Sequence, residues 1–300
     1  MKLKFLSCGE IIWDVYDSEK TLGGAPLNFA MHSARCGAES YILSAVGADE
    51  LGALARDEIT RAGVRSDMLS TSARPTGVCN VTLDACGVPK YIISTDAAYD
   101  RLCLSERDVE RIASLEFDAL YFGTLIQRAT PSREALRYLC ERVKFKNVIC
   151  DVNLRNGCYD ADSAAFCLRN ATILKISDEE EPRLREMGLY HSSDTSPEAI
   201  TKSICQSYPN VRIVLFTMGE RGAVAYSEKE KTLYFTPAKK TQTVSSVGAG
   251  DSFLAAWCTS YLGTEDIRCA NERAAALSSF VVSRKQAVPD YSWQDDKLVF

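Results

Sequence analysis

The chain has 300 residues, of which 46% are hydrophobic and 25% are charged, and its formal net charge is -5. This composition is typical of a globular protein with room for one large α/β domain, and it excludes disordered and fibrous proteins. The net negative charge gives no electrostatic basis for binding nucleic acid or an anionic membrane. No run of 18 apolar residues is present, so we expect no membrane-spanning segment.

The twelve cysteines are scattered singly along the chain, and only two histidines accompany them. Because no C-x-x-C pair occurs, the spacing of a zinc site is absent. We expect the cysteines to be reduced thiols of a cytoplasmic protein. The apolar run in the opening MKLKFLSCGEIIWD is too short for a signal peptide, which agrees with a cytoplasmic location.

Short segments rich in β-branched and aromatic residues alternate with segments of helical periodicity, a pattern typical of βαβ units and a mostly parallel sheet. Strands are predicted at residues 3–7, 40–46, 119–123, 147–152, 173–176 and 212–217. Helices are predicted at residues 27–35, 51–62, 133–142, 197–207, 251–261 and 265–282. The expected fold class is α/β.

One region departs from this pattern. Residues 77–84 and 90–95 alternate with period two and have a turn at Gly87 between them, which predicts an antiparallel hairpin. Such a hairpin in a parallel α/β chain indicates a separate small sheet, which residues 11–16 would join. We therefore expect a single domain, 1–300, with lid segments at about 11–22 and 75–98 that cover the ligand edge of the main sheet.

The stretch SSVGAGDSFLAAW predicts an anion site. Gly248, Ala249 and Gly250 carry almost no side chain, and the apolar run after them predicts a helix that starts there. The free N–H groups and the dipole at a helix start favour a phosphate or a developing negative charge. Asp251 would lie beside that anion as the acceptor of a hydroxyl proton. The alternative is a tight turn with Asp251 as an N-cap.

Two motifs carry a resemblance to a known family. GAGDSF resembles the C-terminal signature of the ribokinase-like (pfkB) sugar kinases, commonly written D-T-x-G-A-G-D, and LGGAPLNFAMHSARCG resembles their other signature, more than 200 residues earlier. The resemblance implies a ribokinase-like α/β/α domain of three layers with a small β lid. It also implies an ATP-dependent kinase of a small-molecule sugar, with Asp251 as the base and residues 248–250 as the anion hole.

The resemblance assigns the sugar side of the site. Asp14, Gly23, Gly24 and Asn28 match the family's sugar-contacting segment, and GEIIWD, which contains Asp14, is similar to the opening of bacterial fructokinases. An aspartate there can bind two vicinal hydroxyls, and the Asn28 amide suits a sugar hydroxyl. Without the resemblance, this segment would be a helix start with an ordinary polar face.

The motif Asp151-Val-Asn153-Leu-Arg155 follows a predicted strand, so its polar side chains should emerge at the carboxyl edge of the sheet. It is shared with fructokinases and 2-keto-3-deoxygluconate kinases. Arg155 is suited to clamp phosphate oxygens, with Asp151 and Asn153 near the sugar or metal-bound water. The alternative is a surface loop with an ordinary salt bridge.

The segment Lys175-Ile-Ser177-Asp-Glu-Glu180 is similar to the family's N-x-x-E motif, whose glutamate helps to hold Mg²⁺ with ATP. Glu180 occupies the glutamate position. Ser177 stands in place of the asparagine, and its shorter side chain would leave room for a water. The run of acidic residues could instead be a solvated first helical turn.

The other nucleotide positions follow the later strands. Thr217, Gly219 and Gly222 match the T-x-G-x-x-G loop beside the nucleotide phosphates, and Asn271 corresponds to the wall that packs on adenine. The family has Asp-Thr where this chain has two serines at 245 and 246. That aspartate belongs to a monovalent cation site, so its loss argues against activation by K⁺.

The motifs together indicate phosphorylation of D-fructose at the 6-hydroxyl, with ATP and Mg²⁺. The alternatives are a 2-keto-3-deoxygluconate kinase or another sugar or nucleoside kinase of the family. A non-catalytic sugar- or nucleotide-binding relative is a third, and the intact GAGD sequence argues against it. Lid strands with free edges are compatible with a homodimer through the lid.

Overall fold

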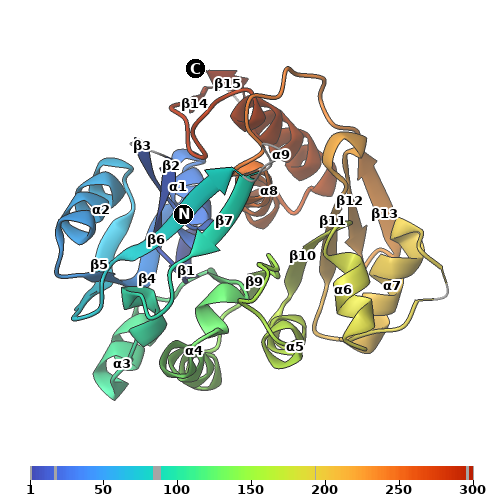
Figure 1. Cartoon of the computed structure of the whole chain (residues 1–300). Coiled ribbons are helices and arrows are strands. Elements are labelled where there is room, and N and C mark those ends of the chain that lie inside the picture. The colour runs from blue at the N-terminus through green and yellow to red at the C-terminus, as the bar shows by residue number, and fades with distance from the viewer. Residues whose placement is uncertain (1, 17–18, 84–88, 193, 295–296, 300) are drawn as a thin grey trace.

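The structure is a computed structural model, which describes residues 2–16, 19–83, 89–192, 194–294 and 297–299. Within these residues, a sheet of nine strands forms the centre, in the order β13-β12-β11-β10-β9-β8-β1-β4-β5 (Figure 1). Neighbouring strands are parallel from β5 to β11, and β12 and β13 are added antiparallel. The strands are β1 (Lys4–Cys8), β4 (Glu39–Gly47), β5 (Arg65–Ser72), β8 (Ala119–Phe122), β9 (Asn147–Asp151), β10 (Ile173–Ser177), β11 (Ile213–Thr217), β12 (Ala223–Ser227) and β13 (Thr232–Thr236).

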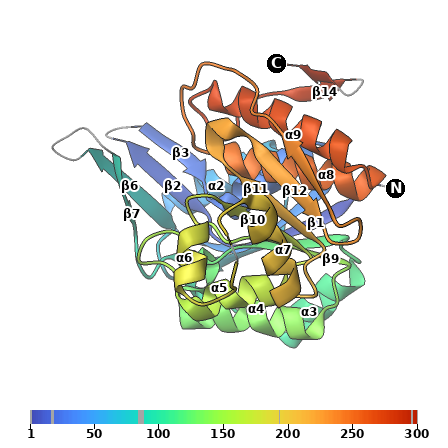
Figure 2. The same ribbon diagram turned by 90° about the vertical axis from the view of Figure 1, so that its right-hand side faces the viewer.

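Helices cover both faces of this sheet, and Figure 2 shows α8 and α9 on one side and α3, α4 and α5 on the other. The three-layer α/β/α fold is therefore confirmed. The helices are α1 (Ala25–Arg35), α2 (Glu50–Arg61), α3 (Glu106–Ser114), α4 (Thr130–Arg142), α5 (Ala161–Asn170), α6 (Glu181–Glu186), α7 (Pro197–Ser207), α8 (Ala249–Thr264) and α9 (Ile267–Val282).

The strands from β4 to β12 in the sheet order are mostly buried, because helices cover both faces of the sheet. Phe5 and Ile173 point to the layer that contains α1, α8 and α9, whereas their neighbours Leu6 and Leu174 point to the layer of α3, α4, α5 and α7. This alternation follows from the period-two geometry of a strand. Each strand thus helps to hold two helical layers in place.

A small sheet with the order β3-β2-β6-β7 extends away from the central sheet (Figures 1 and 2). Its strands are β2 (Ile12–Tyr16), β3 (Glu19–Gly23), β6 (Gly77–Leu83) and β7 (Pro89–Ile93). β6 and β7 pair antiparallel, which confirms the predicted hairpin, and β2 joins β6 in parallel. The predicted turn at Gly87 lies outside the described residues.

Several elements were not expected from the sequence pattern: β3, β5, β12, β13, α3, α5, α6 and the C-terminal strands β14 (Ser292–Gln294) and β15 (Lys297–Val299). β5 is an edge strand with mostly exposed or half-buried side chains, so it lacks a strong apolar pattern. Its free edge is covered because Arg56 donates hydrogen bonds to the carbonyls of Leu69 and Ser70. A free edge covered in this way does not pair with other chains.

The predictions about membranes and thiols can be compared with the described residues. None of the helices in that part of the chain combines the length and the hydropathy needed to cross a bilayer. Each cysteine that the structure describes is a free thiol. The buried members behave as small apolar residues, and burial raises the pKa of Cys258, for example, well above its usual value.

Candidate active site

The site lies where the order of the parallel strands changes direction. β1 has β4 on one side and β8 on the other, although the chain visits β4 first and returns to β8 much later. In open α/β sheets, ligands bind in the crevice at the carboxyl ends of strands that flank such a point. Glu10 follows β1, Asp151 ends β9 and Ser177 ends β10, so polar residues from three strands reach this edge.

The start of α8 leaves backbone donors free. Gly248 is the N-cap, with a left-handed backbone (φ +80°), and no side chain caps the helix. The N–H groups of Ala249 and Ser252 bond to Ser246 and Gly248. In the described part of the chain, those of Gly250 and Asp251 have no acceptor. The alternative in which Asp251 is merely an N-cap is wrong, because Asp251 lies in the first helical turn.

The Asp251 carboxylate is held by a residue from another helix. The side-chain amide of Asn28 in α1 donates a hydrogen bond of 2.8 Å to Asp251 Oδ2. Burial raises the pKa of Asp251, and the Asn28 hydrogen bond and the charges of Lys175 and Arg155 oppose this shift. A carboxylate with a raised pKa is a better proton acceptor near neutral pH, which suits a general base.

A buried ammonium group lies beside the free N–H groups. A Cβ atom added at Gly250 would lie 3.3 Å from Lys175 Nζ. Burial alone would lower the pKa of Lys175, but the carboxylates of Asp151 and Glu180 outweigh it and raise the pKa. The N–H groups of Gly250 and Asp251 and the Lys175 ammonium, together called the anion hole below, are thus suited to a phosphoryl group.

Asp151 is paired with the buried ammonium of Lys175. It is 1% exposed, and both its carboxylate oxygens accept hydrogen bonds of 2.9 Å from Lys175 Nζ. We predicted Asp151 near the sugar or metal-bound water, and this geometry adds a partner that the sequence did not indicate, the ammonium of Lys175. Its role in the structure is to hold Lys175 charged and in place, because a buried ammonium without a partner would lose its proton.

On the sugar side, three predicted residues surround one space. A Cβ atom added at Gly23 would lie 3.5 Å from Asp14 Oδ2 and 3.8 Å from Asn28 Oδ1. Asn28 Oδ1 is buried and has no hydrogen-bond partner among the described residues. Gly24 has φ +106°, and a side chain there would lie 2.5 Å from the Glu10 carbonyl oxygen. Two acceptors thus face a space that only glycine leaves open, an arrangement suited to hydroxyl donors.

Arg155 is the cation of this region. It is exposed, on the loop after β9, and Asn153 in the same loop has a left-handed backbone with φ +41°. Its charge lowers the pKa values of Glu10, Asp14 and Asp251 against the raising effect of burial. The charge of Arg155 thus acts on Glu10 after β1, on Asp14 in β2 and on Asp251 in α8.

Sequence reasoning did not assign a role to Glu10. Its side chain is 3% exposed. Its pKa is raised to about 7, mainly by burial and also by Asp251, although its own N–H, Arg155 and the N–H of Ala25 act to lower it. Its position directly after the first buried strand could have identified Glu10 from the sequence, because buried carboxyl groups at a sheet edge are often functional.

On the nucleotide side, Glu180 is fixed by three donors. Its Oε2 accepts hydrogen bonds of 2.8 Å from both the N–H and the hydroxyl of Ser177, and its Oε1 accepts one of 2.9 Å from Leu154 N. Ser177 therefore orients Glu180, a role that the sequence did not predict.

The loop after β11 carries Gly219 (φ +55°) and Gly222 (φ +96°), and Thr217 Oγ1 donates to the Ile176 carbonyl at 3.4 Å.

Asn271, predicted in the wall that packs on adenine, has partners for both ends of its amide. It is 3% exposed, and its amide oxygen accepts a hydrogen bond of 2.7 Å from Trp257 Nε1. Its amide nitrogen donates to the Tyr234 carbonyl at 3.3 Å. The side chain therefore joins α9 to α8 and β13, and its place in the wall that packs on adenine stays a prediction.

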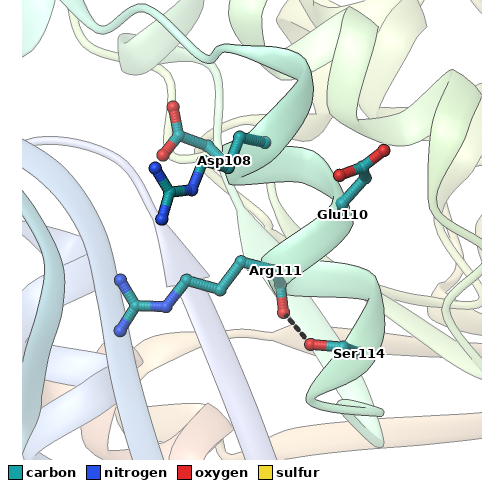
Figure 3. Close-up of a pocket in the computed structure, with 5 residues that line it drawn as sticks. Asp108, Glu110, Arg111 and Ser114 are labelled. Carbon is teal, nitrogen blue, oxygen red and sulfur yellow. Dashed lines mark hydrogen bonds between the residues drawn. The ribbon is translucent and has the colours of Figure 1, made fainter.

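No cluster of three or more His, Cys, Asp or Glu side chains in the described part of the chain could hold a metal ion. An open depression on α3, with Asp108, Glu110, Arg111 and Ser114 among the residues that line it, shares no residue with the candidate site (Figure 3). These charged side chains come from a single helix and are mostly exposed. The chemistry is therefore concentrated at the carboxyl edge of the sheet.

Known proteins resemble this chain over almost all of its length. The model of the pfkB family carbohydrate kinases matches residues 3–294. A fructokinase from Solanum tuberosum is 26% identical over 290 residues, covering 93% of this chain and 86% of that protein. A structure of fructokinase with bound ATP from Xylella fastidiosa has a TM-score of 0.80 at 21% identity and covers 96% of this chain and 94% of that one.

A structure described as ribokinase II from E. coli, in complex with ATP and Mg²⁺, also has a TM-score of 0.80, at 21% identity, and covers 96% of this chain and 95% of that one. The fold, the glycine-rich start of α8 and the family match lead to the same conclusion. The chain belongs to the pfkB family of carbohydrate kinases, enzymes that transfer a phosphoryl group to a sugar hydroxyl.

Proposed function

We propose that this kinase phosphorylates D-fructose at the 6-hydroxyl, with ATP and Mg²⁺, and with Asp251 as the general base. The observation that supports this mechanism best is the position of Asn28. Its amide nitrogen bonds to Asp251 while its buried amide oxygen faces the space beside Asp14 and Gly23. One side chain thus links the space for the sugar to the base.

The proposed step is an in-line transfer. Asp251 accepts the proton of the attacking hydroxyl, whose oxygen forms a bond to the γ-phosphorus as the bond to the ADP oxygen breaks. The free N–H groups of Gly250 and Asp251 and the ammonium of Lys175 stabilise the negative charge on the transferred group. Arg155 is placed to approach the same charge from the exposed side.

The residues fit Mg²⁺ with the nucleotide, since magnesium in kinases is held by one or two carboxylates, waters and phosphate oxygens. Glu180 is the carboxylate that the structure offers. Its oxygens already accept three hydrogen bonds, so we expect it to orient a metal-bound water. Bound magnesium would neutralise part of the phosphate charge. Ser245 is a poor ligand for a monovalent cation, because it carries no negative charge and its Oγ accepts from Val247 N.

Fructose is favoured by the GEIIWD opening and by relatives named fructokinase at about 26% identity. The space beside Gly23 offers acceptors to hydroxyl groups, as a neutral sugar requires. One observation favours 2-keto-3-deoxygluconate instead: Arg155 is a cation beside this space that could bind a substrate carboxylate. We place it on the transferred phosphate because its charge also acts on Asp251.

We further propose that the small sheet is the lid of a single domain, 1–300, that acts in the cytoplasm. Asp14 lies in β2 of this sheet, so closure would bring it onto the sugar. β3 and β7 are the two edges of the sheet, and each offers a free side for a homodimer through the lid.

ADP release measured with fructose, 2-keto-3-deoxygluconate, ribose and a nucleoside tests the proposal. Fructose should give the highest kcat/KM, and the product should be the 6-phosphate by NMR. A preference for 2-keto-3-deoxygluconate would reject fructose and assign Arg155 to the carboxylate. Absence of turnover with every sugar, in a protein that still binds them, would identify a non-catalytic relative.

A further inference from the structure

His32 in α1 is a buried histidine that the mechanism above does not use. His32 is fully buried, and both its ring nitrogens have partners. Nε2 lies 2.9 Å from the Ala287 carbonyl oxygen, and Nδ1 lies 2.8 Å from the Tyr291 hydroxyl. The two rings are stacked, with centroids 5.7 Å apart. A polar ring with two partners inside a core is held in one orientation.

The partners determine which nitrogen carries the proton. A carbonyl oxygen can only accept, so Nε2 must be the donor to Ala287. Nδ1 is then the acceptor of the Tyr291 hydroxyl. The pKa of His32 is lowered to about 4, mainly by burial and also by Arg35, against the effect of the Ala287 carbonyl, so the ring is neutral at pH 7. This neutral tautomer directs one N–H at one backbone carbonyl.

That carbonyl belongs to the segment behind the anion hole. A Cβ atom added at Gly248 would lie 2.5 Å from the Ala287 oxygen and 2.8 Å from its Cα. Ala287 therefore fills the space in which a side chain would stand at the N-cap of α8. Because Gly248 must keep its left-handed backbone to start the helix, any shift of Ala287 changes the surroundings of that turn.

Helix α1 thus reaches the start of α8 once directly and once through the neighbouring segment at Ala287. Asn28 and His32 are four residues apart, and thus on the same face of α1. Asn28 bonds to Asp251 directly, and His32 bonds to Ala287, whose backbone packs against Gly248. We infer that His32 is a positioning residue that keeps the backbone N–H groups of the anion hole aimed at the transferred phosphoryl group. The inference rests on the proposed role of the anion hole.

Two substitutions separate the two contacts of the ring. The amide nitrogen of a glutamine can take the place of Nε2, whereas that of an asparagine reaches only the place of Nδ1. His32→Gln should therefore keep kcat within about 3-fold of the wild type, because it preserves the bond to Ala287. His32→Asn should lower kcat by roughly 10- to 100-fold with little change in KM for the sugar.

Tyr291→Phe is the matched control, since it removes the other partner of the ring and leaves the bond to Ala287. It should lower the melting temperature and leave kcat nearly unchanged. Affinity for ADP with aluminium fluoride, a mimic of the transferred group, should fall in His32→Asn and not in Tyr291→Phe. Equal kcat and aluminium fluoride affinity in the wild type and His32→Asn would overturn the inference, as would parallel losses in all three variants that follow their melting temperatures.

The wild-type enzyme supplies a measurement that does not depend on whether His32→Asn folds. The Nε2 proton of His32 should be visible by ¹⁵N NMR, and its exchange with solvent should slow when ADP and aluminium fluoride bind. Unchanged exchange would contradict the inference. Full turnover in an Asp251→Asn variant would instead reject the proposed function. The aluminium fluoride affinities of the His32 variants would still test the role of His32, because they do not depend on which group accepts the proton.

Discussion

Asn28 in α1 donates a hydrogen bond to Asp251 in α8, and these residues are 223 positions apart in the sequence. The same Asn28 side chain leaves its amide oxygen buried and unpartnered beside Asp14 and Gly23. Sugar binding and proton transfer are therefore connected through one amide. A hydroxyl donor that fills the free acceptor would fix the orientation of Asn28, and with it that of the base.

The first prediction concerns the base. Asp251→Asn keeps the shape of the side chain and an acceptor for Asn28, but it cannot take a proton. We expect kcat to fall by roughly 10² to 10⁴ while the Kd for the sugar, measured by calorimetry, changes little. A variant with near-normal kcat would show that another group accepts the proton.

The second prediction uses the contact between Asn28 and Asp251. Asn28→Asp places a second carboxylate at hydrogen-bond distance, and two carboxylates so close share one proton. The acidic limb of the pH profile of kcat/KM should move to higher pH by about one unit or more. Asn28→Leu is the control, because it weakens sugar binding without adding a charge and should move the limb less. An unmoved limb in Asn28→Asp would mean that Asp251 does not control it.

The third prediction separates two glycines of the GAG motif. Gly248→Ala forces a side chain into the Ala287 backbone at a left-handed residue, so it should lower the free energy of unfolding by about 1 to 3 kcal/mol. In Gly250→Ala the new methyl group meets only the end of the Lys175 side chain, 3.2 Å away, and the residue lies in a helix. We therefore expect near-wild-type stability and a kcat lower by roughly 10-fold or more.

Urea denaturation and ADP release on the two variants test this contrast. A Gly250→Ala enzyme with full activity would show that the free N–H groups of α8 do not approach the phosphoryl group. A Gly248→Ala protein as stable as the wild type would mean that Ala287 moves away without cost.

The fourth prediction concerns stability and pH. The pKa of buried Glu10 is raised to about 7 from 4.5, so the folded protein binds this proton more tightly than the unfolded chain does. The contribution of Glu10 to the free energy of unfolding is therefore fully present below pH 4.5. It is lost as the pH rises through about 7, and the loss amounts to up to about 3 kcal/mol. Glu10→Gln removes this loss. Its advantage in free energy of unfolding over the wild type should be greater at pH 8 than at pH 5, in the absence of ligands. An equal advantage at both values would contradict the prediction.

The fifth prediction tests the lid. Ser94 and Val78 exchange hydrogen bonds at the base of the β6–β7 hairpin, and Arg128 bonds to Ser94 from the main domain. Replacing residues 80–92 by a short Gly/Ser link leaves this base in place, so the α/β core should fold. The KM for the sugar should rise by roughly 10-fold or more, and ATP use should shift from transfer towards hydrolysis, since water is no longer excluded.

If the hairpin were only a dimer contact, the same variant would be monomeric with an unchanged KM for the sugar and an unchanged ratio of transfer to hydrolysis. Size-exclusion chromatography and the two kinetic quantities, measured on one preparation, distinguish these outcomes.

The sequence by itself was sufficient for the elements that build the parallel sheet. β4, β10 and β11 are mostly apolar segments because both of their faces are buried, and such segments are recognisable without a partner. The β6–β7 hairpin was recognisable from its period of two. The glycines before α8 predicted the anion site, because a helix start without side chains can be recognised from a local stretch of sequence.

Three strands of the central sheet were not recognised in this way. β5 is an edge strand, and β12 and β13 form a short antiparallel addition to the sheet. Their assignment depends on pairing with β4 and β11, which is a tertiary contact, and their own β-propensity is a weak signal beside it.

The partners of polar side chains were decided only by the tertiary structure. Asp151 bonds to Lys175 on the neighbouring strand, Glu180 to Ser177 and Leu154, and Asn271 to Trp257. A motif shows that such residues come to the sheet edge, but burial requires each of them to find a donor or acceptor, and which one is within reach depends on how the strands and helices pack. Asn28 and Asp251 meet because α1 packs against α8 at the point where the sheet reverses its order, and no local pattern in either helix encodes that contact.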